Sequence, residues 1–190
     1  MPILGVIASS TRQGLVTDTG VMFPIGAVTV GSAGASSITF SSIPATYTHL
    51  QVRIMARQSE ADTTSSFSFR VNGSTDGADY YRFHYLLGNG STVSAGASDT
   101  QANIYGGGLP AANSGSNIFG VSIIDILDYK NTNKAKTIRT LNGTDKNGSG
   151  DLYFLSGLYI PTTAISSLTF LGATSFAQYS SFALYGIKGA

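Results

Sequence analysis

Two aspartates in an otherwise apolar stretch are the first residues that could support acid–base chemistry. Asp125 and Asp128 lie in NIFGVSIIDILDY, residues 117–129. An odd separation along a strand places two side chains on opposite faces, whereas a glycosidase needs two carboxylates within roughly 5–10 Å. We therefore expect no catalytic pair here. We expect Asp125 to be partly buried, and either to act as a structural cap or to pair with Arg139 on the next strand.

The segment DKNGSGD, residues 145–151, offers oxygen ligands that could suit Ca²⁺. A calcium loop of the helix–loop–helix kind closes with Glu at its twelfth position. That position is Ser156 here, and no helical periodicity flanks the segment. We therefore expect a hairpin tip without a metal ion. The oxygen ligands are Asp145, Asn147, Ser149 and Asp151, with Gly150 at the place of the sharp turn.

The remaining motifs predict no cofactor and no nucleophile. His49 and His84 are the only histidines, and two histidines do not make a catalytic zinc site without carboxylate help. Cysteine is absent, which excludes disulfides and thiolate metal sites. The segment GGGLP, residues 106–110, lacks the Lys-Ser/Thr ending of a phosphate loop. We expect no catalytic residue, no cofactor and no metal, and hence no enzyme.

The densest aromatic patch is the candidate contact surface. Its rings, with an arginine between them, could stack on sugar rings or bases. Packing in the core and between subunits is the commoner role, because aromatic residues dominate such contacts by area, and we favour it here. The patch comprises Tyr80, Tyr81, Arg82, Phe83 and Tyr85.

Asparagine–glycine pairs mark the expected turns. Each of the four pairs is followed by Ser or Thr, so each also matches the N-glycosylation pattern. Asn-Gly supplies the positive φ angles that a type I′ hairpin needs, and the sequence shows no secretory signal. We therefore expect turns without glycans. The pairs begin at Asn72, Asn89, Asn142 and Asn147.

Alternation of apolar and polar residues predicts an all-β fold. It is clearest in THLQVRIMAR, residues 48–57, where Leu50, Val52 and Ile54 share one face. Short strands at spacings near ten residues, without helical periodicity, predict an antiparallel β-sandwich that is jelly-roll-like. The expected strands lie at residues 36–40, 48–57, 67–71, 117–129, 136–140, 151–160, 165–171 and 180–188.

Three segments need separate interpretation. Residues 80–87 fit either a strand or a helical turn. Residues 88–116 have loop composition, interrupted by a short strand candidate at 102–105. Residues 117–129 carry Ile, Val and Leu on both faces, which predicts a strand that is covered on both sides.

The low charge of the chain limits its partners. The 190 residues carry a net charge of +1, and only 11% are charged, against about 25% in an ordinary domain. A nucleic-acid surface normally shows a clustered basic patch, and a membrane-spanning helix needs roughly 20 apolar residues. We expect neither partner. A surface so poor in charge repels neighbours weakly and suits packing into an assembly.

The first thirty residues are the least patterned part of the chain. We expect residues 1–30 to form an extended N-terminal attachment arm, ahead of a β-sandwich domain at 31–190. The apolar run 3–8 is short for the core of a signal peptide and has no basic segment before it. The alternative is a first strand pair of the domain, since ordered termini are usually bound to a sheet. The expected arm anchor comprises Ile3, Leu4, Val6 and Ile7.

Three stretches, in their order and spacing, resemble small structural proteins of tailed bacteriophages, especially phages of cyanobacteria and other aquatic bacteria. The opening ILGVIASS is also similar to the start of such proteins. The resemblance covers most of the chain, includes no catalytic motif, and extends to head-decoration and tail-appendage proteins alike. The stretches are SSIPATYTHLQVR (41–53), IIDILDYKNTNKAKTIRTLNG (123–143) and FAQYSSFALYGIKG (176–189).

The resemblance implies a non-enzymatic virion protein, made in the host cytoplasm and homo-oligomeric, often as a homotrimer. The short length, the single β domain and the arm favour a trimeric capsid cement or decoration protein. It would bind the major capsid protein or other virion proteins on the outer surface of the head. The alternative is a tail-fibre or tail-tip module that recognises a host surface glycan. The aromatic patch and the long segment 88–116 favour that alternative, because binding residues often lie on loops.

Overall fold

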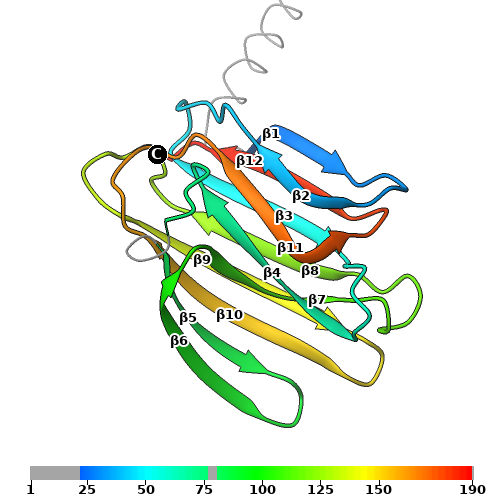
Figure 1. The fold of residues 1–190 in the computed structure, drawn as a ribbon. Coiled ribbons are helices and arrows are strands. Elements are labelled where there is room, and N and C mark those ends of the chain that lie inside the picture. Colours follow the sequence, from blue (N-terminus) through cyan, green and yellow to red (C-terminus); the bar gives the residue numbers. More distant parts are fainter. Residues whose placement is uncertain (1–21, 77–80, 190) are drawn as a thin grey trace, which may run out of the picture.

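A computed structural model describes residues 22–76 and 81–189 (Figure 1). This part of the chain contains twelve strands and no helix, which confirms the predicted all-β class. The strands are β1 (Met22–Thr29), β2 (Ala35–Phe40), β3 (His49–Ala56), β4 (Thr64–Val71), β5 (Tyr81–Gly88), β6 (Val93–Gln101), β7 (Ile104–Pro110), β8 (Gly120–Ile126), β9 (Lys136–Asp145), β10 (Gly150–Tyr159), β11 (Leu168–Phe176) and β12 (Ser181–Ile187).

Two antiparallel sheets form the predicted sandwich. The large sheet has eight strands in the order β1-β12-β3-β8-β9-β10-β5-β6, and the small sheet has four in the order β2-β11-β4-β7. Figure 1 shows the small sheet lying across one face of the large sheet. Several neighbours in the sheets are distant in sequence, such as β1 with β12 and β2 with β11, as in jelly rolls.

The core lies between the facing sides of the two sheets. In β3, Leu50, Val52 and Ile54 are buried, as their alternation predicts. The small sheet supplies aromatic residues, among them Phe69 and Phe170, whose ring centroids are 5.8 Å apart. Burying each such side chain contributes about 1.5–3 kcal/mol. This burial fixes the register of each strand, because a slip by one residue would turn its apolar set to solvent.

The segment 88–116 is not the loop that its composition indicated. It contains β6 and β7, and the strand candidate at 102–105 overlaps only the start of β7. The glycines of β7 are required by packing. A Cβ on Gly106 would lie 2.3 Å from the ring of Phe67, and a Cβ on Gly107 would lie 2.6 Å from the side chain of Asn142 on β9. The absence of a side chain at these glycines allows β7 to approach the large sheet closely. The glycine-rich composition of the segment does not by itself indicate this approach.

The other two ambiguous segments are also strands. Residues 81–88 form β5, so the helical turn is excluded. The strand expected at 117–129 is shorter, and its outward side chains Val121 and Ile123 are 50% and 39% exposed. The prediction that both faces of this strand are covered is therefore wrong. The small sheet covers one face of the large sheet, and no other described element covers the opposite face.

Part of the expected N-terminal arm belongs to the sandwich. Residues 22–29 form β1, which pairs with β12 at the edge of the large sheet. The domain therefore includes residues 22–29, which were expected in the arm. For these residues the alternative, a terminus bound to a sheet, is correct. The expected anchor residues Ile3, Leu4, Val6 and Ile7 lie outside the described residues, so the arm stays a prediction for residues 1–21.

The two sides of the sandwich differ. On one side β1 and β2 lie close together, since a Cβ on Gly26 would be 3.3 Å from the ring of Phe40. On the other side the small sheet ends at β7, which packs over β8, β9 and β10. Strands β5 and β6 extend beyond β7 as an overhang (Figure 1, lower edge, green). The large sheet is therefore covered at one end and open at the other.

Candidate functional site

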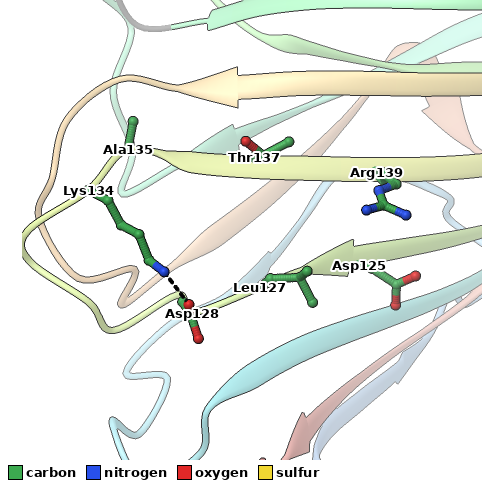
Figure 2. A pocket seen from close by; sticks show the side chains of 7 residues that line it. All are labelled: Asp125, Leu127, Asp128, Lys134, Ala135, Thr137 and Arg139. Carbon is green, nitrogen blue, oxygen red and sulfur yellow. Dashed lines mark hydrogen bonds and ion pairs between the residues drawn. The ribbon is translucent and has the colours of Figure 1, made fainter.

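Asp125 and Asp128 line the same shallow pocket, so the prediction that they lie on opposite faces is wrong. The alternation argument requires a continuous strand, but β8 ends at Ile126. The chain then turns, and Asp128 adopts a φ of 50°. The pocket has a volume of about 290 Å³. Figure 2 shows the side chains that line it: Asp125, Leu127, Asp128, Lys134, Ala135, Thr137 and Arg139.

Both carboxylates in this pocket have hydrogen-bond partners. Gln51 Nε2 donates to Asp125 Oδ1 over 2.8 Å. Arg139 lies opposite Asp125 in the strand register, but the hydrogen bond to the carboxylate comes from the glutamine. Lys134 Nζ donates to Asp128 Oδ2, and this bond holds the pKa of Asp128 below its usual value. A general acid needs a carboxyl pKa raised towards the working pH, so Asp128 is poorly suited to that role.

The two histidines lie far apart. His49 is on β3 and His84 is on β5, with three strands between them, roughly 19 Å at ~4.8 Å per strand. The backbone N–H of Asp128 donates to His49 Nδ1 over 3.0 Å, so this histidine caps the turn after β8. Residues 22–76 and 81–189 contain no group of three or more His, Cys, Asp or Glu that could hold a metal ion. None of the described chain forms a helix long and apolar enough for membrane crossing.

The candidate calcium segment is the tip of the β9–β10 hairpin, as predicted. Asn147 and Gly148 have φ values of 58° and 110°. The N–H of Lys146 donates to the carbonyl oxygen of Ser149 over 2.7 Å, which closes the turn. Lys146 Nζ lies 3.6 Å from Asp151 Oδ2. One of the candidate calcium ligands therefore pairs with a lysine of the same hairpin.

The other asparagine–glycine pairs do not all form turns. Asn72 and Gly73 have φ values of 53° and 66°, which confirms the turn there, and Gly90 has a φ of 88°. Asn142 is instead a fully buried residue within β9. Its side chain lies between the two sheets, against Gly107. The turn predicted at Asn142 is wrong because its position in the core, and not its local sequence, decides its conformation.

The candidate contact surface is only partly described. Tyr80 lies outside the described residues, and so do the side chains of Tyr81 and Arg82. Phe83 and Tyr85 lie in β5, opposite Gly157 and Leu155 of β10, which are both buried. Their side chains therefore share the inner face of the large sheet.

Phe83 and Tyr85 belong to a group of four half-buried rings, which we call the aromatic cluster. The ring of Tyr105, on β7, lies 5.6 Å from Phe83 and 5.8 Å from Tyr153, on β10, between centroids. Tyr85 and Tyr105 are 6.4 Å apart. The cluster lies where the small sheet ends, so it fills the angle between β7 and the overhang. Packing explains this arrangement without a ligand.

The outward side of the large sheet carries an apolar surface that no other described element covers. Six adjacent strands of the large sheet, in the order β3-β8-β9-β10-β5-β6, each contribute at least one large apolar side chain that is 39–76% exposed. We call these eight residues the outer apolar face. They are Met55, Leu86, Val93, Val121, Ile123, Leu141, Leu152 and Phe154.

Cross-strand pairing arranges the outer apolar face in two rows. In the first row Ile123, Leu141, Phe154 and Leu86 lie opposite one another in turn. The second row alternates larger side chains with glycine, and its four central residues line a hollow of about 650 Å³ that reaches the hairpin tips. The residues of the second row are Met55, Val121, Gly143, Leu152, Gly88 and Val93.

The extent of this face indicates an interaction surface. The two rows, which span four and six strands, cover roughly 330 Å², at ~4.8 Å between strands and ~6.8 Å between alternate residues. The largest contiguous apolar patch on a soluble monomer is typically about 300–600 Å² and is often functional. A row of polar residues bounds the face on one side. That row comprises Gln51, Asp125, Arg139, Ser156 and His84.

This face was not predicted from the sequence, although one signal pointed to it. The apolar run 117–129 was interpreted as a strand between two layers, whereas an interface also gives apolar residues on both faces. Leu141 and Phe154 could be assigned to the same surface only through the pairing of β8, β9 and β10. That pairing brings together residues distant in sequence.

No protein-family model matches the sequence, and no curated protein matches it. Among solved structures, galectin LEC-6 of Caenorhabditis elegans is 9% identical, with 86% of this chain and 96% of that chain covered and a TM-score of 0.30. A fructofuranosidase of Schwanniomyces occidentalis is also 9% identical, with 90% of this chain and 35% of that chain covered and a TM-score of 0.25. Similarities this low carry no argument about function.

Proposed function

We propose that the protein is a non-enzymatic structural component of a tailed-phage virion, and that it acts through its outer apolar face. The resemblance of the sequence to small phage structural proteins supplies the class. The outer apolar face is the observation that supports an assembly role, because large apolar side chains gathered on one exposed face are often a binding surface. Within this class we propose a homotrimeric cement or decoration protein on the outside of the head.

Burial of the outer apolar face contributes a free energy similar in size to the cost of association. Burying roughly 330 Å² of apolar surface contributes about 8 kcal/mol at ~25 cal/mol per Å². Association costs on the order of 4–15 kcal/mol in lost freedom. Binding is thus favourable only against a surface of matching shape. A protein that binds the assembled shell and not its free subunits stabilises the shell by mass action.

The test uses virions of the phage that encodes the chain, and shells from which the protein has been removed. A double variant, Leu141→Asn with Phe154→Asn, removes the centre of the outer apolar face. The control is Thr137→Asn, an exposed position in β9 on the same side of the sheet. We expect the wild type and the control to rebind stripped shells and restore their resistance to osmotic shock. The double variant should bind at least tenfold more weakly, since each side chain contributes more than about 1 kcal/mol.

Two results would contradict this proposal. The first is that stripped shells survive osmotic shock as well as complete ones. The second is that antibody against the protein labels only the tail of intact virions. Because the double variant changes exposed positions, its thermal denaturation should remain within a few degrees of the wild type, which separates lost binding from lost folding.

A tail module that binds a host glycan is the second candidate. The aromatic cluster favours it, because four half-buried rings lie at the open end of the sandwich, and aromatic rings stack on sugars. We expect the isolated protein in that case to bind host cells, and Tyr85→Ala to reduce binding. Absence of binding by the wild type would remove this candidate and leave the head location untouched.

A further inference from the structure

Strand β6 differs from the other sheet edges of the described chain. The edges are β1 and β6 in the large sheet, and β2 and β7 in the small sheet. Edge strands expose unpaired N–H and C=O groups, and proline, bulges and short length are devices that prevent pairing with other chains. Strand β1 contains Pro24 and a bulge next to it. Strand β7 contains a bulge and ends at Pro110, and β2 has only six residues.

Strand β6 has none of these devices over residues 93–98, and its bulge lies between Ser98 and Gln101. It is nine residues long and its sequence, VSAGASDTQ, contains no proline and no Lys, Arg or Glu. Its one charged residue is Asp99, near its end. Its pairing with β5 is regular from Phe83 to Gly88, with the register shift only before Phe83. The strand packs mainly against β5, in the overhang beyond the small sheet. The result is a long edge with small side chains and a free row of backbone groups.

We propose that β6 pairs antiparallel with β6 of a second copy of this chain, about a two-fold axis that is perpendicular to the sheet and passes between the two strands. Each unpaired N–H and C=O on the free side of β6 then finds a partner of the same geometry. The two large sheets become one continuous sheet. The two overhangs, each open on its inner side, become neighbours.

The sequence of β6 is compatible with pairing between two copies of the strand. Residues 93–98 carry no charge, so a two-fold axis at Ala95, which places this residue opposite its own copy, brings no like charges together. Ala95 and Ala97 are exposed and small, which allows the partner strand to approach without a clash. Ala95 also lies opposite Leu86. The first row of the outer apolar face therefore continues across the junction into the second copy.

This inference goes beyond the proposed function and does not depend on it. A two-fold junction through β6 joins copies in pairs. If the protein is also a trimer, the same junction joins one trimer to the next. Binding to a shell uses the outward side chains of the outer apolar face, whereas pairing uses the backbone groups at the edge of β6, so either can fail while the other holds.

The absence of cysteine in the chain gives a direct test. Single variants Ala95→Cys and Ala97→Cys place one thiol on β6. The control Ala27→Cys places an exposed thiol on β1, the opposite edge of the same sheet and the same outward side. A disulfide forms between two copies only where the Cα atoms come within roughly 4.4–6.8 Å. After mild oxidation of the full-length protein, we expect one β6 position to give at least fivefold more covalent dimer than Ala27→Cys.

Light scattering on the wild type completes the test. We expect a mass corresponding to a dimer, or to a hexamer if trimers are joined. The variant carrying Ala95→Lys and Ala97→Lys should halve that mass, because charge on an edge strand opposes pairing. A wild-type monomer at all concentrations would overturn the proposal. Equal cross-linking at Ala27 and at both β6 positions would also overturn it, and so would a cross-link formed only in a mixture of the Ala27→Cys and Ala95→Cys proteins.

Discussion

The ammonium group of Lys136 donates to the carbonyl oxygen of Thr162 over 2.8 Å. Lys136 is only 1% exposed, which is unusual for a lysine. The same Nζ donates to the carbonyl oxygens of Lys134, over 2.9 Å, and of Asn131. Burial lowers the pKa of this lysine. Three backbone acceptors thus replace the usual carboxylate partner. They join the loop between β8 and β9 to the loop between β10 and β11.

We expect Lys136→Met to reduce the free energy of unfolding by about 2 kcal/mol. Methionine fills much of the same space but leaves the three carbonyl groups without their donor. Losing a hydrogen bond to a charged group costs about 1.5–3 kcal/mol, and water that reaches the carbonyl groups reduces this cost. The control is Lys130→Met, at an exposed position in the same loop. Urea denaturation of both variants gives the comparison. Equal midpoints for the two variants would show that the carbonyl contacts contribute nothing.

The strand that begins at Lys136 also shows how far the sequence alone could lead. Its alternation predicted a strand through Lys136, Ile138 and Thr140 or through the residues between them, and left the buried set undecided. The structure buries Lys136 and Thr140 together with Ile138. Hydropathy favours the opposite choice for a lysine. Burial is tolerated here because Thr162, distant in sequence, supplies an acceptor, and local patterns carry no information about such a partner.

The same limit separates the confirmed elements from the missed ones. Strand β3 could be predicted because Leu50 and Val52 alternate with polar residues, and this alternation alone indicates that they are buried. Strand β7 could not, because its glycines are needed for contact with Asn142 on the other sheet. The outer apolar face was missed for a related reason, since pairing between strands decides that Leu141 and Phe154 adjoin. Sequence therefore predicted the class and most strands, and failed where a partner strand decides the outcome.

Two glycines with positive φ separate the effect of backbone conformation from that of close packing. Gly73 has a φ of 66° with open space around it, whereas Gly107 has a φ of 111° and would place a Cβ 2.6 Å from the side chain of Asn142. We expect Gly73→Ala to lower the free energy of unfolding by about 1–2 kcal/mol, the cost of a left-handed conformation. Gly107→Ala should lower it by about 3 kcal/mol or more, because a steric clash in the core adds to the strain. Thermal denaturation of the two variants measures the difference, and a smaller loss for Gly107→Ala would mean that β7 moves away from β9 at little cost.

Alkaline pH should destabilise the fold through two phenols, the half-buried Tyr153 and the fully buried Tyr129. Burial raises the pKa of Tyr153, with a further contribution from its hydrogen bond with Tyr105, and burial also raises the pKa of Tyr129. An unfolded tyrosine loses its proton near pH 10. Above about pH 10 the unfolded chain therefore releases protons that the folded chain keeps, and the free energy of unfolding falls as the pH rises. Below that pH the contribution of both groups is fully present.

Tyr153→Phe tests this dependence against an opposing effect of Lys136. The lowered pKa of that lysine makes stability rise with pH between its folded and unfolded values, so the total profile mixes two signs. The difference between wild type and Tyr153→Phe isolates the phenol. We expect the variant to lose stability less steeply above pH 10, by at most about 1.4 kcal/mol per pH unit before solvent screening reduces it. The control is Tyr179→Phe, at a ring that is 68% exposed. Urea denaturation from pH 8 to 11 provides the measurement, and parallel profiles for the wild type and Tyr153→Phe would show that the phenol of Tyr153 titrates alike in the folded and unfolded chain.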